Sequence, residues 1–278
     1  MKSIVCYIIY GENQGYYNSA KFSILNLLNY TKGNNIEIVV LSEKIEEFKG
    51  YPVTSIEITK HQIDDWSLSG KYHFRIKNLG IQHIVQTLNL SSNDKIIFFD
   101  TDIYFQKNPL QLLDMISNSK AIMYQDEGFI CKKKRFDYYK NNLSKKTLEC
   151  KNGKTYSMTL NAKMWGSAII GLPGKTALKL LQNADNIMLC ILSKIDVEKA
   201  HTIEQFSLSE SVKEIHKIIE GKKYVSIYST DRKKINAEKE IAKFFKNNNE
   251  SYNELLSKKS LSVNLKRTLV QIIKDRFQ

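Results

Sequence analysis

Two aspartates stand two positions apart in an apolar stretch of the sequence, and their carboxylates could hold a divalent cation. Asp100 and Asp102 flank Thr101, with apolar residues at 96–99 before them and at 103–105 after them. Mg²⁺ or Mn²⁺ binds one or two protein carboxylates and completes its shell with phosphate oxygens and water. Such a cation neutralises a diphosphate leaving group as a Lewis acid. Ordinary turns also contain this spacing, but an exposed turn is rarely set between two apolar segments.

The surrounding sequence predicts an α/β fold with these aspartates at the end of a strand. Apolar, β-branched segments are predicted strands at residues 4–10, 36–41, 53–58, 95–99, 121–124 and 167–172. Apolar residues recur with a helical period at residues 19–30, 75–88 and 175–192. This alternation predicts a mostly parallel sheet with helices on both faces. Ligands bind beyond the carboxyl ends of such strands, which selects residues 10–12, 100–102 and 125–127.

Further acidic residues are candidates for proton transfer. Asp126 and Glu127 follow a predicted strand, and either could deprotonate an acceptor hydroxyl. A solvated acidic loop fits the same residues equally well. Glu204 follows Thr202, which could cap a helix in a capping box with Gln205. A helix cap and a catalytic site can coincide, so both interpretations of Glu204 stay open.

Three sequence blocks resemble the family 8-like glycosyltransferases of the GT-A fold. In that family an Arg-bearing helix leads into an apolar strand that ends in D-x-D, as FRIK (74–77) and KIIFFDTD (95–102) do here. The segment WGSAIIGL (165–172) resembles the family's small-residue strand beside the donor sugar, and TIEQF (202–206) resembles its acidic-Gln helix start. The blocks follow the family's order over about residues 1–210. The resemblance implies a Rossmann-like GT-A domain that transfers a sugar from a nucleotide diphosphate sugar to a hydroxyl.

The resemblance also assigns roles to individual residues. Asp100 and Asp102 would bind Mn²⁺ or Mg²⁺, and Asp100 would also lie near the nucleotide ribose. Arg75 would contact the donor diphosphate or sugar, and Tyr10 and Gly11 would line the base pocket. Gly166 and Ser167 would allow the sugar to approach the backbone closely. Glu204 and Gln205 would face the reacting sugar carbon. Independently of the family, Trp165 could stack on an acceptor sugar, although a half-buried structural tryptophan is more common.

The sequence departs from the family 8 pattern at one point. Its members usually carry a late His-Tyr pair whose histidine is the third metal ligand, and residues 225–231 contain no histidine. Asp231 or water would then complete the metal shell. The departure leaves three matters open: retaining stereochemistry, membership of a related GT-A group, and a catalytically inactive GT-A domain that still binds nucleotide.

The net charge of +13 indicates an acidic partner. Residues 131–154 form a basic excursion in which nine cations outnumber Asp137 and Glu149. The nine are Lys132, Lys133, Lys134, Arg135, Lys140, Lys145, Lys146, Lys151 and Lys154. This segment is either a solvated loop or a flap that holds an anionic glycan or a lipid-linked acceptor. A catalytic domain is predicted over residues 1–232, with a basic helical extension at 233–278 that either contacts an anionic membrane surface or packs on the domain.

Low proline and glycine with abundant Lys, Asn and Ile suggest an AT-rich bacterial source, and other features favour a cytoplasmic enzyme. No apolar run is long enough to span a bilayer, and the four cysteines form no metal-type pairs, so reduced thiols are expected. A UDP-sugar donor and the synthesis of capsule or lipopolysaccharide would suit such an enzyme. The competing class is a basic nucleic-acid-binding protein. The sequence contains no helix-turn-helix, zinc-finger, RNP-type or Walker signature, so no nucleic-acid partner is expected.

Overall fold

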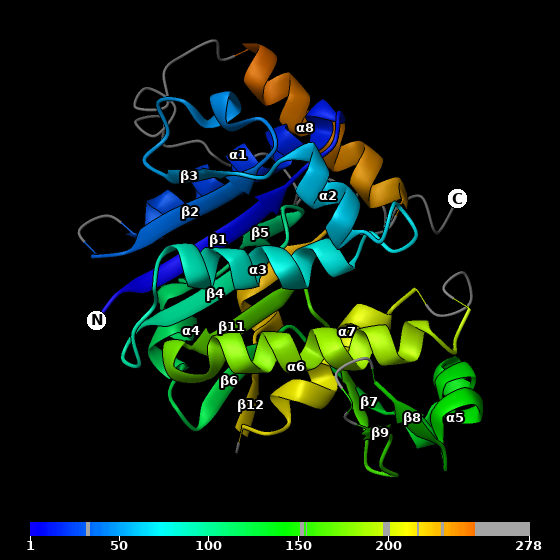
Figure 1. Cartoon of the computed structure of the whole chain (residues 1–278). Coiled ribbons are helices and arrows are strands. Elements are labelled where there is room, and N and C mark those ends of the chain that lie inside the picture. Colours follow the sequence, from blue (N-terminus) through cyan, green and yellow to red (C-terminus); the bar gives the residue numbers. More distant parts are fainter. Residues whose placement is uncertain are drawn as a thin grey trace, which may run out of the picture.

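A seven-stranded sheet forms the centre of the molecule. The computed structural model describes residues 1–31, 34–150, 153, 155–196, 201–215, 217–228 and 231–247. The strand order is β12-β6-β11-β4-β1-β2-β3. The strands are β1 (Ser3–Ile9), β2 (Glu37–Ser42), β3 (Thr54–Glu57), β4 (Lys95–Phe99), β6 (Lys120–Met123), β11 (Ile169–Pro173) and β12 (Lys217–Glu220) (Figure 1). Only β11 runs antiparallel to its neighbours in this sheet. The mostly parallel α/β sheet expected from the sequence is confirmed.

The central strands are buried on both faces because their sequences are almost entirely apolar. In β1, Cys6 and Ile8 pack into one core cluster, whereas Val5 and Tyr7 pack into the other. This alternation follows from the two-residue period of a strand. A sheet with two apolar faces needs a layer of helices on each side.

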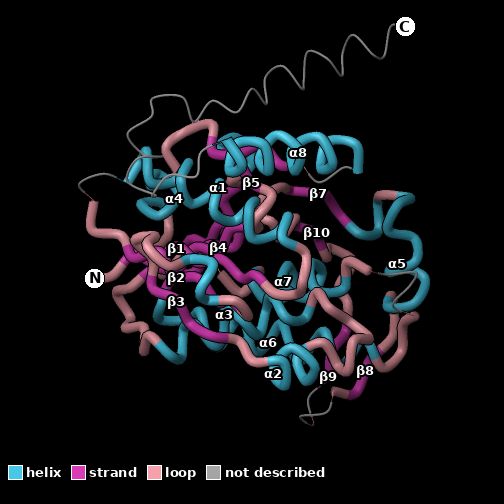
Figure 2. Tube along the Cα trace, turned by 90° about the horizontal axis from the view of Figure 1, so that it is seen from above, coloured by secondary structure: helices cyan, strands magenta, loops and turns pink. Residues whose placement is uncertain are grey.

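Helices cover both faces of the sheet (Figures 1 and 2). One face packs against α3 (Arg75–Thr87), α6 (Gly174–Leu192) and α7 (Ile203–Val212), and α2 (Lys60–Trp66) packs on α3. The other face packs against α1 (Gln14–Thr31) and α4 (Leu110–Met115). Gly80 lets α3 approach β1 closely, since a Cβ atom there would lie 2.6 Å from Ile8 Cδ1. This close approach fixes the helix that leads to the candidate site.

The segment from β7 to β10, which contains the basic excursion, packs around a core that it shares with α6 and α7. Its elements are β7 (Asp126–Phe129), η2 (Ile130–Lys132), η3 (Lys134–Phe136), α5 (Asp137–Leu143), β8 (Thr147–Glu149), β9 (Thr155–Ser157) and β10 (Lys163–Trp165). Phe136, Tyr139 and Leu148 pack there against residues of α6 and α7. A disulfide joins Cys150 to Cys190, so the expectation that all cysteines are reduced was wrong for this pair. The two cysteines are 40 positions apart, and only the packing of β8 on α6 brings them together.

The remaining elements complete the surroundings of the sheet's carboxyl edge. They are β5 (Ile103–Phe105), β13 (Val225–Ile227), η1 (Ile45–Phe48), η5 (Lys222–Tyr224) and α8 (Asp231–Asn247). α8 packs on α1, and its Ala237 and Ile241 are buried against Phe22 and Leu25. The predicted domain boundary at residue 232 stays a prediction.

The structure bears only on the first part of the predicted C-terminal extension. The rest of that extension, residues 248–278, lies outside the described residues, so the expected membrane contact stays a prediction. Among the helices that the structure describes, none combines the length and apolar character that crossing a bilayer would require.

Candidate functional site

The D-x-D turn lies where two pockets meet beyond the carboxyl end of β4. The larger pocket has a volume of about 440 Å³ and the smaller about 250 Å³. Four residues line both pockets: Phe74, Lys77, Asp100 and Asp102. The position of the two aspartates therefore agrees with the rule that selected them, namely that ligands bind beyond the strand ends.

Hydrogen bonds from two other segments hold the turn in place. The Asp100 N–H donates to the carbonyl of Ala168, just before β11, at 3.0 Å. The Tyr228 N–H donates to the Asp102 carbonyl at 3.3 Å, and the Tyr228 hydroxyl donates to the Thr101 carbonyl at 3.5 Å. The turn is thus held on both sides by backbone that the sheet and the β5–β13 pair position.

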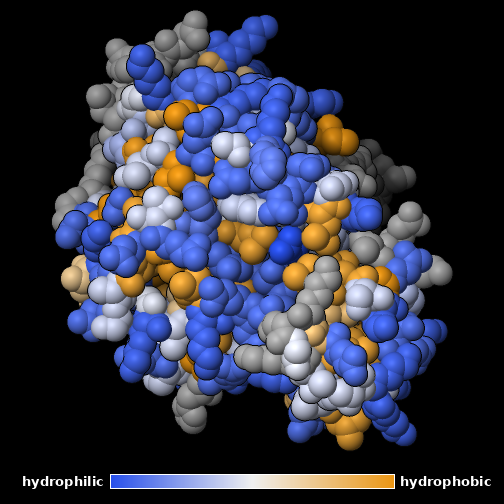
Figure 3. Space-filling view, in the orientation of Figure 1, coloured by the Kyte–Doolittle hydropathy of each residue, from blue (hydrophilic) through white to orange (hydrophobic). Residues whose placement is uncertain are grey.

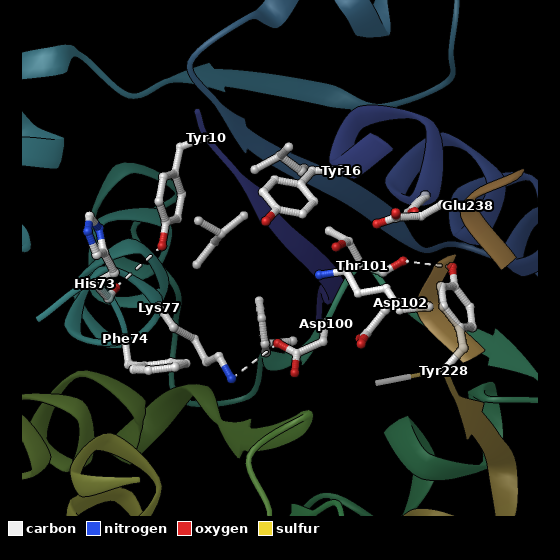
Figure 4. A pocket seen from close by; sticks show the side chains of 15 residues that line it. Tyr10, Tyr16, His73, Phe74, Lys77, Asp100, Thr101, Asp102, Tyr228 and Glu238 are labelled. Atoms are coloured by element: carbon white, nitrogen blue, oxygen red, sulfur yellow. Dashed lines mark hydrogen bonds and ion pairs between the residues drawn. The ribbon is translucent and has the colours of Figure 1, made fainter. Parts of the chain in front are cut away.

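Aromatic side chains form much of the wall of the larger pocket. Figure 4 shows the rings of Tyr10 and Tyr16 on one side and Asp100 and Asp102 on the other. The Tyr10 hydroxyl donates to the His73 carbonyl at 3.4 Å, which ties the end of β1 to the start of α3. Burial raises the pKa of Tyr10 to about 12, so its phenol stays neutral near pH 7.

Lys77 is the cation closest to the D-x-D turn among the ion pairs of the described residues. Its Nζ lies 3.1 Å from Asp100 Oδ1 and 3.9 Å from Glu204 Oε1. The same ammonium donates to Ser167 Oγ at 3.3 Å. Burial alone would lower the pKa of Lys77, but the charges of Asp100 and Glu204 outweigh burial and raise it above the usual value. Lys77 is therefore a fixed positive charge between the two pockets.

Asp102 has an environment that disfavours its negative charge. Burial, and next the charge of Asp100, raise the pKa of Asp102 to about 6. Two neighbouring carboxylates with one ammonium group carry surplus negative charge, which a divalent cation would neutralise. Within the described part of the chain, no group of three or more His, Cys, Asp or Glu could hold a metal. Two neighbouring carboxylates fit a cation that takes two protein ligands and otherwise binds phosphate and water.

The α8 helix supplies one wall of the larger pocket. Lys234 and Glu238, one helical turn apart, both line it. Lys234 Nζ lies 4.9 Å above the ring of Tyr16, and its charge lowers the pKa of Asp102, although burial and Asp100 outweigh this effect. The side chain of Asp231, the expected alternative metal ligand, lies outside the described part of the structure.

Glu204 is a buried carboxylate that faces the smaller pocket. Its Oε2 accepts a hydrogen bond from Ser167 Oγ at 3.0 Å, whereas its Oε1 has no hydrogen-bond partner among the described residues. Burial raises the pKa of Glu204 to about 7. Thr202 does not form the expected capping box, because its hydroxyl bonds to the Tyr139 hydroxyl at 2.8 Å instead. Glu204 Oε1 is therefore a polar atom that a ligand hydroxyl could satisfy.

The smaller pocket also contains Gln205 and Glu127. Gln205 Nε2 donates to Glu127 Oε1 at 3.0 Å, and Arg135 Nη2 lies 3.0 Å from Glu127 Oε2. Gly166 lines the same pocket, and a Cβ atom there would lie 2.9 Å from Tyr124 Cδ1. The structure thus brings together Gly166, Ser167, Glu204 and Gln205, all of which the sequence had selected.

Arg75 is not at this site. Its guanidinium binds both carboxylate oxygens of Asp185 on α6, at 2.7 and 2.9 Å, and it lines neither pocket. Residues two positions apart on a helix point in directions about 200° apart. Lys77 therefore faces the pockets whereas Arg75 faces α6, and the expected contact between Arg75 and the donor stays a prediction that this geometry does not favour.

Three other predicted residues lie outside the linings of both pockets. Gly11 has a positive φ of 86°, and its N–H donates to Glu43 Oε2 at 2.8 Å. Asp126 is exposed and forms an ion pair with Lys163 at 2.8 Å. Trp165 is half-buried and packs against the core, as a structural tryptophan does. The next residue, Glu127, is the one of these two carboxylates that lines the smaller pocket.

Sequence reasoning missed several residues that line the pockets. His73 precedes α3, Lys77 comes from α3, Tyr228 follows β13, and Lys234 and Glu238 come from α8. The helical period of α3 shows that Arg75 and Lys77 lie on different sides of the helix, but not which side faces the D-x-D turn. The spacing of Lys234 and Glu238 shows that they share a face of α8, but nothing in the sequence shows that this face reaches the D-x-D turn.

The fold and the site define a mixed α/β protein with paired carboxylates at the edge of a mainly parallel sheet. No protein-family model and no curated protein sequence matches the chain. Among solved structures, it is similar to the apo form of WbbM, a bifunctional glycosyltransferase, at 15% identity and a TM-score of 0.43, over 74% of this chain and 37% of WbbM. It is also similar to the galactosyltransferase LgtC in complex with donor and acceptor sugar analogues, at 8% identity and a TM-score of 0.48, over 75% of this chain and 70% of LgtC. Neither structure is similar enough to assign an activity, so the site must support the assignment.

Proposed function

We propose that the chain is a GT-A-type glycosyltransferase that moves a sugar from a nucleotide diphosphate sugar, specifically a UDP-sugar, to a hydroxyl group. The acceptor would be a glycan or a lipid-linked glycan. The observation that supports this proposal best is the position of Asp100 and Asp102 on the boundary between two pockets of unequal size. A nucleotide sugar has the same division, since its diphosphate lies between a larger nucleoside and a smaller sugar.

In this proposal the larger pocket binds the nucleoside. Tyr10 and Tyr16 offer aromatic surface for a base, and aromatic rings stack on bases without requiring one particular base. Asp100 lies near enough to the same pocket to accept a hydrogen bond from a ribose hydroxyl. The choice of uridine rests on the family resemblance, because the pocket itself provides no feature specific to uracil.

The diphosphate would lie at the boundary, where the protein supplies both charges that it needs. Asp100 and Asp102 would hold Mn²⁺ or Mg²⁺, and the bound cation would neutralise the leaving diphosphate. Lys77 and Lys234, which both line the larger pocket, would add positive charge. Lys77 would also hold Asp100 in place through the ion pair between its ammonium group and Asp100 Oδ1.

The smaller pocket would bind the donor sugar and the attacking hydroxyl. Glu204 Oε1 would accept a hydrogen bond from a sugar hydroxyl, which would satisfy its free oxygen. Gly166 would let the sugar approach the backbone, and Gln205 would face the reacting carbon. Glu127 would orient the acceptor hydroxyl from the opposite side, in place of Asp126.

Isothermal titration of UDP with and without Mn²⁺ tests this function. We expect metal-dependent binding that Asp102→Asn abolishes and that Asp126→Asn, whose side chain lies outside both pockets, leaves unchanged. If UDP, GDP and CMP all fail to bind, the enzyme proposal has to be abandoned. Salt-sensitive binding of nucleic acid would then support the competing class.

Two further measurements place the protein within the proposed class. Metal-dependent hydrolysis of a UDP-sugar would separate an active enzyme from an inactive GT-A domain that only binds nucleotide. If the enzyme is active, we propose that it acts at the cytoplasmic face of the membrane in bacterial surface polysaccharide synthesis, such as that of capsule or lipopolysaccharide. Fractionation of cells that produce the chain would test this location.

A further inference from the structure

Several cations gather where β7 ends, beside the smaller pocket. Lys132 Nζ lies 4.8 Å from the centre of the Phe129 ring, and Lys163 Nζ lies 4.9 Å from the same centre. Lys133 lies against Gly128, where a Cβ atom would come within 2.9 Å of its Nζ. We call Lys132, Lys133, Arg135 and Lys163 the β7 basic cluster.

Neighbouring carboxylates neutralise only half of the β7 basic cluster. Lys163 forms an ion pair with Asp126 at 2.8 Å, and Arg135 pairs with Glu127 at 3.0 Å. Lys132 and Lys133 are exposed and form no ion pair with any carboxylate of the described residues. The cluster therefore has two positive charges that remain available to a ligand.

The same cluster is joined directly to the smaller pocket. Arg135 Nη2 binds Glu127 at two points. It lies 3.0 Å from Glu127 Oε2 and donates to the Glu127 backbone carbonyl at 2.9 Å. Glu127 lines the pocket and accepts a hydrogen bond from Gln205. Gly128, on which Lys133 lies, follows Glu127 directly. A ligand that extends from the pocket past Glu127 would thus meet Lys132 and Lys133.

We infer that the β7 basic cluster binds a negatively charged group, a phosphate or a carboxylate, on the acceptor. This inference rests on the proposed function, because it takes the smaller pocket as the place where the acceptor hydroxyl reacts. The donor diphosphate has cations of its own in the larger pocket, Lys77 and Lys234, of which Lys77 also lines the smaller pocket. Lysine ammonium groups bind phosphate as point charges and need no fixed fork geometry. At the corner of the molecule where α5 lies, hydrophilic surface alternates with hydrophobic patches (Figure 3).

Small acceptor mimics can test the inference with the full chain. UDP and Mg²⁺ are added first, so that the donor pocket is filled. Methyl glucoside, glucuronic acid and glucose 6-phosphate are then titrated at low salt, and binding is followed by saturation-transfer NMR. We expect the charged sugars to bind about fivefold to tenfold more tightly than methyl glucoside, as two exposed charge contacts would allow.

Paired variants separate this cluster from the general charge of the protein. Lys132→Gln/Lys133→Gln should remove the preference for charged sugars and leave UDP binding unchanged. Lys120→Gln/Lys175→Gln removes two exposed lysines at the opposite end of the sheet and should keep the preference. Unchanged thermal unfolding of each double variant would show that it is folded.

Each outcome bears on the inference separately from the proposed function. Preference for glucose 6-phosphate alone supports a phosphate-bearing acceptor, and equal preference for glucuronic acid supports an acidic sugar. The inference is overturned if wild type binds charged and neutral sugars alike, or if both double variants lose the preference equally. It is also overturned if Lys132→Gln/Lys133→Gln weakens binding of the protein to phosphatidylglycerol vesicles but does not weaken binding of the charged sugars. Failure of UDP to bind would instead contradict the proposed function.

Discussion

Lys77 Nζ lies 3.1 Å from Asp100 Oδ1, which joins α3 to the turn after β4. The lysine side chain is largely buried, whereas 30% of the aspartate side chain remains accessible. Asp100 therefore has a permanent cationic partner on one side and an open side toward the pocket. An ion pair in this position does two things: it holds the Asp100 carboxylate against α3, and it places positive charge beside any phosphate bound there.

Replacing Lys77 should weaken donor binding without unfolding the protein. We expect Lys77→Gln to reduce UDP affinity about tenfold in the presence of Mn²⁺, because one charge contact to the diphosphate is lost and Asp100 loses its partner. Isothermal titration would measure the change. Lys71→Gln removes an exposed lysine that precedes the same helix and serves as the matched control. Equal affinities of the Lys77 and Lys71 variants would contradict this role.

Replacing Arg75 should lower the stability of the protein and leave donor binding unchanged. Arg75 and Asp185 are mostly buried, so Arg75→Gln leaves the Asp185 carboxylate without its partner and should lower the free energy of unfolding by about 2–3 kcal/mol. UDP affinity should not change, because Arg75 lines neither pocket. Urea unfolding and UDP titration on the same variant measure both effects. If Arg75→Gln lowered UDP affinity and left the free energy of unfolding unchanged, Arg75 would be a donor contact, as the family resemblance implies.

These two residues show how far the sequence predicts the site. The strand ending at Asp100 was predictable because its residues are apolar and the turn after it is polar. The helix beginning at Arg75 was also predictable from its period. Which side of that helix faces the strand ends depends on the packing of Gly80 against Ile8, and this packing links parts of the chain that are far apart in sequence. Lys77 was therefore passed over in favour of Arg75.

Long-range packing also limited the prediction of the basic excursion and of α8. The lysines of the excursion suggested a solvated segment, but Tyr139 and Leu148 between them are buried against α6 and α7. The disulfide between Cys150 and Cys190 depends on the same packing. For α8, the sequence predicts a basic helix but does not show what its apolar side covers. In the structure that side packs against Phe22 on α1.

The buried Glu204 should make stability depend on pH. Its folded pKa of about 7 exceeds the ordinary value of 4.5, so the folded state binds more protons than the unfolded state between these pH values. The stability contributed by the protonated carboxyl is present below about pH 4.5 and is lost as pH rises through 7. Glu204→Gln cannot ionise, so its stability relative to wild type should rise by up to about 3 kcal/mol between pH 4.5 and pH 8. Urea unfolding at both pH values measures the difference, and a constant difference would contradict the burial of a titrating carboxyl.

The α8 helix should contribute to donor binding through Lys234. This lysine lines the larger pocket, and its charge acts on Asp102 across that pocket. We expect Lys234→Gln to lower UDP affinity about threefold to tenfold, because a partly exposed ammonium contributes less than a buried one. Lys239→Gln on the exposed side of the same helix keeps the net charge matched and should leave affinity unchanged. The effect of Lys234→Gln should also shrink as salt concentration rises, since exposed charges are screened. Titration of UDP at two salt concentrations would show this, and equal behaviour of the two variants would mean that α8 packs on α1 without taking part in binding.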